Sequence, residues 1–130
     1  MAKELKRILY VDDEPDIRSV AKMSLEMVGG FTVLICASGA EALQKATDFA
    51  PDLILLDVMM PQMDGPATLA ALRQLPALAT TPVLFFTAKV QSDEVEEFKK
   101  LGAIDVVAKP FKPMQLPQTL REIWENAIKA

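Results

Sequence analysis

The sequence predicts an α/β fold, a doubly wound parallel sheet of five strands that alternate with five helices. Short apolar runs take turns with helical apolar patterns along the 130 residues, and this alternation is typical of a parallel sheet covered on both faces. The run Leu53–Leu56 is apolar at every position, as a strand buried on both faces requires. Asp57 follows it directly, and open α/β sheets bind ligands at the carboxyl ends of their strands.

The expected strands and helices of the first half of the chain begin and end at recognisable residues. We expect strands at Arg7–Val11, Phe31–Cys36 and Leu53–Asp57. Pro15 occupies a first helical turn, where proline is tolerated, and the glycines 29 and 30 end that helix. Its apolar face is expected to consist of Ile17, Val20, Ala21, Leu25 and Val28. The second helix starts at a capping box, Ser38 to Glu41, and reaches Phe49.

The second half of the chain continues the same alternation. A third helix follows Gly65-Pro66 and stops near Pro76. A fourth helix, with acidic residues in its first turn, runs from Ser92 to about Leu101. The expected strands are Pro82–Thr87 and Ala103–Ala108. The last helix begins at Pro113 or Gln115 and ends at Lys129, with an inward face of Leu116, Leu120, Ile123, Ala127 and Ile128.

Composition places the chain among globular proteins of one domain. Of its residues, 51% are hydrophobic and 25% are charged, and the length suits one domain better than two. The net charge of −4 argues against direct nucleic-acid binding, because phosphate contacts need clustered Lys and Arg. The chain has no histidine, which excludes histidine bases, ligands and phosphohistidine within it.

Cellular location and core composition follow from a few residues. The single cysteine, Cys36, predicts a small core residue in a reducing compartment, and no signal peptide or membrane-length apolar run is present. We therefore expect a cytoplasmic protein without membrane insertion. Trp124 is expected to pack beneath the last helix. Core filling and chance, rather than an adaptable binding surface, are the expected explanation for Met23, Met27, Met59, Met60, Met63 and Met114.

Polar residues stand where the predicted strands end. Five strands fit the flavodoxin-like order 2-1-3-4-5, in which strands 1 and 3 are neighbours at the topological switch point. Asp12 and Asp13 follow strand 1, Asp57 ends strand 3, Thr87 ends strand 4 and Lys109 follows strand 5. In that order, three carboxylates converge in one crevice with a hydroxyl and an ammonium beside them.

This set of side chains predicts magnesium-dependent phosphoryl chemistry. Three close carboxylates repel one another unless a cation is present, and oxygen ligands in small number suit Mg²⁺. A carboxylate can accept a phosphoryl group covalently, and the transfer needs mainly positioning and charge neutralisation. We expect Asp57 to be the acceptor and Asp12 and Asp13 to hold the metal, with Lys109 and Thr87 contacting the phosphoryl oxygens.

Four segments of the chain closely resemble the receiver domain of two-component response regulators. They are Val11-Asp12-Asp13-Glu14-Pro15, the stretch from Leu55 to Gly65, Phe86-Thr87-Ala88 and Lys109-Pro110-Phe111. The resemblance covers the whole chain in order. The chain is similar to a stand-alone, chemotaxis-type receiver. We expect residues 1–130 to form a single receiver domain without an output domain.

The resemblance implies a function and a set of site residues. Asp57 would accept phosphate from a sensor histidine kinase or histidine phosphotransfer protein, and Thr87 and Lys109 would contact the phosphoryl group. The metal ligands would be Asp12, Asp13, Asp57 and the backbone carbonyl of Met59. Lys109-Pro110 would be a cis peptide, and the side chains at Met59 and Lys89 would modulate self-dephosphorylation.

The resemblance also implies how such a protein acts. It catalyses only its own phosphorylation and dephosphorylation, and is not otherwise an enzyme. It signals through contacts with a downstream protein target, as a monomer or weak dimer.

Val106 departs from the family pattern. Receivers usually carry Tyr or Phe three residues before the lysine, as a rotamer switch coupled to the threonine, and valine cannot swing in that way. We hypothesise that output relies more on the loop after strand 4 and on the fourth helix.

Three other functions remain open at this point. A receiver-shaped interaction module that is never phosphorylated is permitted by Val106, although the full acidic set argues against it. A magnesium-dependent phosphohydrolase would need a second aspartate two residues after Asp12, where Glu14 stands, and a substrate cap. A flavin-binding domain would need a phosphate-cradling loop after strand 1, where this chain has acids.

Overall fold

Five parallel strands form one sheet in the order β2-β1-β3-β4-β5, as predicted. The computed structural model describes residues 4–88 and 91–129. The strands are β1 (Arg7–Val11), β2 (Thr32–Cys36), β3 (Leu53–Asp57), β4 (Val83–Thr87) and β5 (Asp105–Ala108). Every residue of β3 and β4 is buried, because helices cover both faces of the sheet.

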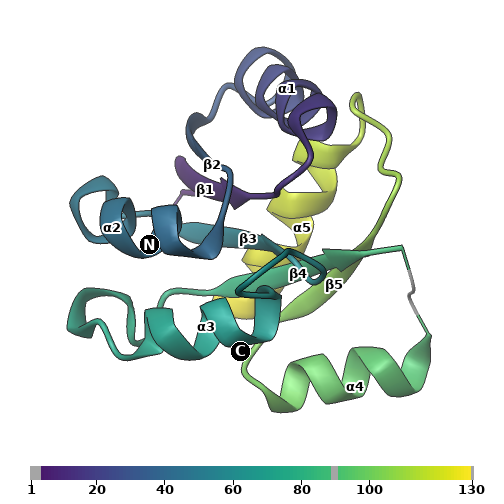
Figure 1. The fold of residues 1–130 in the computed structure, drawn as a ribbon. Helices are drawn as coiled ribbons and strands as arrows, with labels where there is room; N and C mark the ends of the chain where they lie inside the picture. Colours follow the sequence, from purple (N-terminus) through teal and green to yellow (C-terminus); the bar gives the residue numbers. More distant parts are fainter. Residues whose placement is uncertain (1–3, 89–90, 130) are drawn as a thin grey trace.

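The helices lie in two layers (Figure 1). One layer holds α2 (Gly39–Phe49), α3 (Gly65–Arg73), the 3₁₀ turn Pro76–Leu78 and α4 (Ser92–Lys100). The other holds α1 (Pro15–Met23), the π-helical segment Ser24–Val28 and α5 (Leu116–Lys129). Each layer packs an apolar cluster against its own face of the sheet, and Asp57 ends the middle strand between them.

The helix starts explain the local structure of the loops. The Ser38 hydroxyl accepts from the Glu41 amide at 3.1 Å, and a Glu41 carboxylate oxygen accepts from the Ala37 amide at 2.6 Å. The predicted capping box therefore forms, although Glu41 reaches the residue before the cap. Asp64 caps α3 by accepting from the Ala67 amide at 2.9 Å.

The face of α1 differs from the prediction at two residues. Ala21 and Leu25 are fully buried, but Val20 is 43% and Val28 is 42% exposed. The buried stripe follows the four-residue spacing from Ile17 through Ala21 to Leu25, and Val20 lies beside it. Val28 belongs to the π-helical segment, whose wider turn shifts the residues after Met23 from their positions on an ideal α-helix.

The core prediction holds for Cys36 and Trp124 but fails for several other residues. Cys36 is fully buried, Trp124 is 3% exposed, and Met60 is buried. Core filling does not account for four of the methionines, Met23, Met27, Met59 and Met114, which are exposed. Ile128, expected to face inward on α5, is 36% exposed. Leu116 and Leu120 of α5 are buried as predicted.

No helix among the described residues is both long enough and apolar enough to cross a lipid bilayer.

Candidate functional site

Four carboxylates meet at the carboxyl ends of β1 and β3. Asp12, Asp13, Glu14 and Asp57 each offer an oxygen, and these atoms lie within 4.8 Å of one another. Parallel pairing places β3 directly beside β1, with Val11 opposite Leu56, so the residues that follow both strands share one edge. The predicted convergence of the acids from two separate segments is therefore present in the structure.

Burial differs sharply among the four acids. Asp12 is fully buried and Asp57 is 4% exposed, whereas Asp13 is half-buried and Glu14 is exposed. Sequence reasoning gave Glu14 no part in the site and missed its place in the cluster. Its position two residues after Asp12, in the loop that leaves β1, was the available signal. The cluster thus has a buried floor and a solvent-facing rim.

Lys109 supplies the positive charge at this site. Its ammonium lies 3.0 Å from Oδ2 of Asp57, 3.1 Å from Oδ2 of Asp12 and 3.5 Å from Oε1 of Glu14. The side chain is 12% exposed. Burial lowers the pKa of Lys109, but its hydrogen bonds with the two aspartates outweigh this, and the net direction is upward. Lys109 is therefore charged and partly neutralises the cluster.

The Asp57 carboxylate is held from both sides. Its Oδ1 accepts from the Met59 amide at 3.3 Å while its Oδ2 accepts from Lys109. Burial raises the pKa of Asp57 to about 6, the bond with Lys109 opposes that rise, and the charge of Asp12 adds to it. Crowded carboxylates with one ammonium hold excess negative charge, which a cation would offset.

Thr87, Met59 and the peptide after Lys109 are the further predicted features that the structure describes. Thr87 ends β4 and is 7% exposed; because Asp57 pairs with Phe86, Thr87 lies one residue beyond that pair on the neighbouring strand. The peptide between Lys109 and Pro110 is cis, as the resemblance implied. The Met59 side chain is 77% exposed. Lys89 lies outside the described residues.

The donor set fits Mg²⁺. All the candidate ligands are oxygen atoms, which this hard cation prefers, and the exposed rim leaves access for the water molecules that it retains. A site for zinc or copper would be expected to contain nitrogen or sulfur ligands. None of the four acids is opposed by an arginine at ion-pair distance among the described residues.

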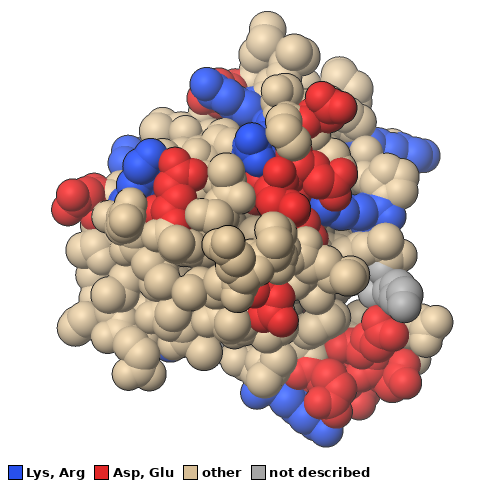
Figure 2. Space-filling view, in the orientation of Figure 1, with Lys and Arg blue, Asp and Glu red and all other residues tan. Residues whose placement is uncertain are grey.

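The charged surface extends beyond this site. Figure 2 shows acidic side chains gathered over α4, at the lower right of the view. They come from its sequence Ser92–Lys100, which has no buried residue and carries Asp93, Glu94, Glu96 and Glu97.

Comparison with known proteins identifies similar chains. The family model described as "Response regulator receiver domain" matches residues 8–121. The chain is 39% identical over 122 residues to the alkaline phosphatase synthesis transcriptional regulatory protein PhoP of Bacillus subtilis, covering 94% of this chain and 50% of that protein. It is 40% identical over 123 residues to the transcriptional regulatory protein CpxR of Escherichia coli, covering 95% of this chain and 51% of that protein.

The similar solved structures share the fold. Chemotaxis response regulator CheY4 of Vibrio cholerae superposes with a TM-score of 0.84 at 34% identity, covering 92% of this chain and 98% of that one. The chain spans about half the length of the curated relatives named above, and nearly all of this structural neighbour.

Proposed function

Because the chain belongs to the response regulator receiver family and so serves two-component phosphorelay, we propose that Asp57 is its phosphoryl acceptor. One observation carries this proposal. The Lys109 ammonium lies about equally close to the carboxylates of Asp57 and Asp12, and so links the ends of β3 and β1. Asp57 is the only acid in the central strand β3. Its carboxylate accepts a hydrogen bond from Lys109 and lies close to the carboxylates of the other three acids.

We further propose a Mg²⁺ ion held by Asp12, Asp13, Asp57 and the backbone carbonyl of Met59. The closeness of the carboxylate oxygens supports the three acidic ligands. When bound, the cation supplies charge neutralisation for the acids and for phosphoryl oxygens. Glu14, at the exposed rim, would contact the water that completes such a coordination shell.

The proposed reaction moves one phosphoryl group in each of two steps. A carboxylate oxygen of Asp57 attacks phosphorus, a P–O bond forms, and the P–N bond of a phosphohistidine breaks with its electron pair returning to the imidazole nitrogen. In the second step a water oxygen attacks phosphorus and forms a new P–O bond. The P–O bond to Asp57 breaks with its electron pair returning to the carboxylate, and the water protons leave with inorganic phosphate or with solvent. The phosphohistidine belongs to a partner, since this chain has no histidine.

Two side chains would stabilise the transferred group. Lys109 is already charged and buried beside Asp57, so it can turn from the carboxylates to phosphoryl oxygens without entering from solvent. Thr87, at the end of the adjacent strand, would donate its hydroxyl to one of those oxygens. In this proposal the protein catalyses its own phosphorylation and dephosphorylation and acts on no other substrate.

An exposed apolar surface beside the site supports docking of the phosphodonor protein. We call it the methionine surface; its members are Val20, Met23, Met27 and Met114. The Ser24 hydroxyl donates to the Pro113 carbonyl at 2.5 Å, which joins the π-helical segment after α1 to the loop before α5. A pocket of about 230 Å³ lies between Val20 and Lys109, so this surface adjoins the site. Flexible Met side chains adapt to varied partners.

Location and output are the remaining parts of the proposal. We propose a cytoplasmic protein, because its single, buried cysteine suits a reducing compartment. The output would be a contact with a downstream protein, without direct binding of nucleic acid by this domain, whose net charge is −4.

Intact mass spectrometry after incubation with acetyl phosphate and Mg²⁺ tests the acceptor. The expected result is one phosphoryl adduct, which is absent in Asp57→Asn and absent when a chelator removes the metal. Asp64→Asn is the matched control, because Asp64 lies in the same loop but caps α3 and should keep the adduct. An adduct that persists in Asp57→Asn would overturn the assignment.

The same experiment separates the second candidate function. If the wild-type protein forms no adduct with acetyl phosphate or with a phosphorylated histidine protein, a receiver-shaped interaction module that is never phosphorylated becomes the better description. Val106, at the position that usually holds an aromatic switch, is the feature that favours this candidate.

A further inference from the structure

Tyr10 lies directly beneath the acidic cluster and has no part in the chemistry described above. Alternate residues of a strand point to the same face of a sheet, so Tyr10 and Asp12 project to one side of β1. The Tyr10 side chain is fully buried, and its hydroxyl lies 3.1 Å from Oδ2 of Asp12. A tyrosine therefore reaches the buried carboxylate from within the core.

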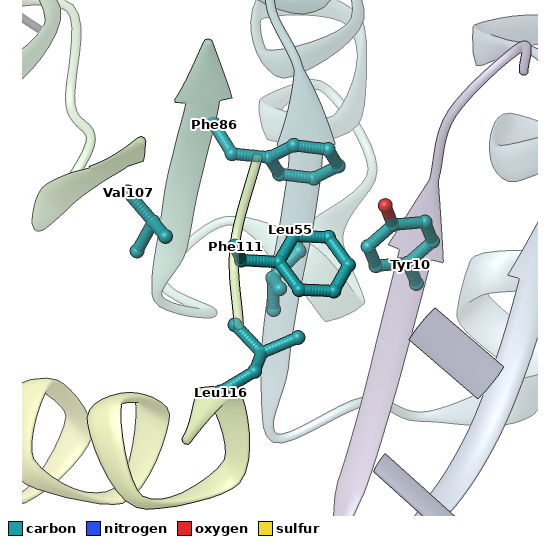
Figure 3. Close-up of a pocket in the computed structure, with 6 residues that line it drawn as sticks. All are labelled: Tyr10, Leu55, Phe86, Val107, Phe111 and Leu116. Atoms are coloured by element: carbon teal, nitrogen blue, oxygen red, sulfur yellow. The ribbon is translucent and has the colours of Figure 1, made fainter. Parts of the chain in front are cut away.

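The tyrosine ring is fixed by its packing. It stacks on Phe86 with ring centroids 4.9 Å apart and an interplanar angle of 21°. Figure 3 shows Tyr10 facing Phe86, Phe111 and Leu116 around a small apolar pocket beneath the site. The pocket is too narrow to hold a water molecule. The ring cannot turn without displacing its neighbours, so the position of the hydroxyl is set by the core.

The Tyr10 hydroxyl remains a proton donor. Burial raises the pKa of Tyr10 far above its usual value, and the charge of Asp12 raises it further. The hydroxyl donates its hydrogen bond to Oδ2 of the Asp12 side chain.

Among the described residues, three groups donate hydrogen bonds to the Asp12 carboxylate or lie at ion-pair distance from it. They differ in how firmly each is held in place. Oδ1 of Asp12 accepts from the Glu14 amide at 3.0 Å, while Oδ2 meets the Tyr10 hydroxyl and, at 3.1 Å, the Lys109 ammonium. Lys109 is shared with Asp57 and sits on a flexible chain. If Lys109 turns toward a phosphoryl group, Tyr10 is the side-chain donor that stays with Oδ2 among those described.

We propose that Tyr10 is a positioning residue that holds the Asp12 carboxylate in its metal-binding orientation while Lys109 exchanges partners. The inference rests on the proposed function, in which Asp12 binds Mg²⁺ and Lys109 meets the phosphoryl group. A ligand carboxylate whose orientation is fixed by a hydrogen bond from a rigid group loses less freedom when it binds a metal. Tyr10 would touch neither the metal nor the reacting atoms.

Calorimetric titration of the unphosphorylated protein with Mg²⁺ tests the inference without a measurement of activity. Tyr10→Phe keeps the ring and removes only the hydroxyl, and we expect it to weaken Mg²⁺ binding about tenfold. Phe111→Leu is the matched control, because it alters the same pocket and leaves the hydroxyl–carboxylate bond intact. Its affinity for Mg²⁺ should stay within about twofold of wild type.

A kinetic measurement adds a second readout. With acetyl phosphate, the Mg²⁺ concentration for half-maximal phosphorylation should rise about tenfold in Tyr10→Phe, while the rate at saturating Mg²⁺ changes far less. Equal Mg²⁺ affinity in wild type and Tyr10→Phe would overturn the inference and leave the proposed function intact. Equal weakening by Phe111→Leu would overturn it too, in favour of general packing.

Two further outcomes are informative. Absence of Mg²⁺ binding in the wild type would contradict the proposed function itself. If Tyr10→Phe fails to fold, the wild-type protein still decides: NMR of the Tyr10 hydroxyl proton should show slow exchange with water and a contact with Asp12 in the presence of Mg²⁺. A rapidly exchanging hydroxyl proton would overturn the inference.

Discussion

The Lys109 ammonium bridges Asp57 and Asp12, at 3.0 Å from one carboxylate and 3.1 Å from the other. Because Asp57 ends β3, Asp12 follows β1 and Lys109 follows β5, one cation joins the carboxyl ends of three strands. The bridge stabilises two buried negative charges in the metal-free protein, and it holds Lys109 where the proposed phosphoryl group would form.

Removing the bridge should destabilise the metal-free protein. Lys109→Met leaves Asp12 and Asp57 buried without a counter-charge, and we expect a loss of about 3 kcal/mol in the free energy of unfolding. Mg²⁺ should restore part of this loss, because it binds the same acids. Urea unfolding with a chelator and with Mg²⁺ measures both effects. Lys100→Met, which breaks the exposed pair with Glu97, is the control and should change little.

Stability of the metal-free protein should depend on pH through Asp57. The pKa of Asp57 is raised to about 6 in the folded protein, so the folded state binds its proton more tightly than the unfolded state does. The raised pKa of Asp57 therefore stabilises the folded protein. This stabilisation is complete below the unfolded pKa near 4 and is lost as pH rises through about 6. In a chelator, Asp57→Asn should therefore gain up to about 3 kcal/mol over wild type between pH 4 and pH 7. A constant difference across that range would contradict the assignment.

Gly65 should tolerate no side chain. A Cβ there would lie 2.6 Å from the Asp57 carbonyl oxygen and 2.9 Å from the Val58 Cα, and backbone atoms cannot move aside as side chains can. We expect Gly65→Ala to cost about 2 kcal/mol of stability and to lower the phosphorylation rate by shifting the loop after Asp57. Gly30→Ala is the control: it meets open space, and its positive φ of 71° predicts only about 1 kcal/mol. Chemical unfolding and acetyl phosphate labelling measure the two effects.

The methionine surface should affect transfer from proteins but not from small molecules. Met23 is 62% exposed, and Met23→Glu would place a charge where we propose an apolar surface of the partner to dock. We expect phosphotransfer from a cognate histidine protein to slow at least tenfold, since burying an unpaired charge costs more than 1.4 kcal/mol. Labelling by acetyl phosphate should be unchanged. Leu101→Glu, an exposed leucine after α4, should leave both rates unaffected, and equal slowing by both donors would contradict the docking role.

Phosphorylation should change the conformation of α4. Val106 packs on the same apolar cluster as Phe98 of α4, and its side chain cannot swing as an aromatic ring does. We expect beryllofluoride with Mg²⁺, a mimic of the phosphorylated state, to shift the amide resonances of α4 and of the loop before it. The measurement compares NMR spectra of the free and beryllofluoride-bound protein. Unchanged resonances throughout α4 would contradict the hypothesis.

Most of the site could be predicted because it depends on strand ends. The apolar runs that end at Val11 and Leu56 define two buried strands, and the order of a doubly wound sheet makes them neighbours. Asp12 and Asp57 then lie together at the carboxyl ends of these strands, and Lys109, which follows β5, lies beside them. Roles for these residues in metal binding and phosphoryl transfer stay predictions.

The exposure of apolar side chains was predicted less well. Helical periodicity shows which side of a helix is apolar, but not how many residues of that side are buried. Val20 fits the apolar pattern of α1, yet only the residues that face the sheet directly are buried. Met23, Met27 and Met114 are exposed, because none of the residues described by the structure covers α1 and the loop before α5 from outside. Nothing in their residue type distinguishes an uncovered methionine from a buried one.

By itself, the sequence determined the strands, the helices and the candidate acids, because apolar periodicity, caps and turn residues act over a few positions. Only the tertiary structure decided how these groups share partners: that Lys109 holds Asp12 and Asp57 together, that Glu14 joins the rim, and that Tyr10 reaches Asp12 from the core. Such contacts depend on distances of a few ångströms between segments far apart in the chain. Those distances are set when the strands pair and the side chains pack.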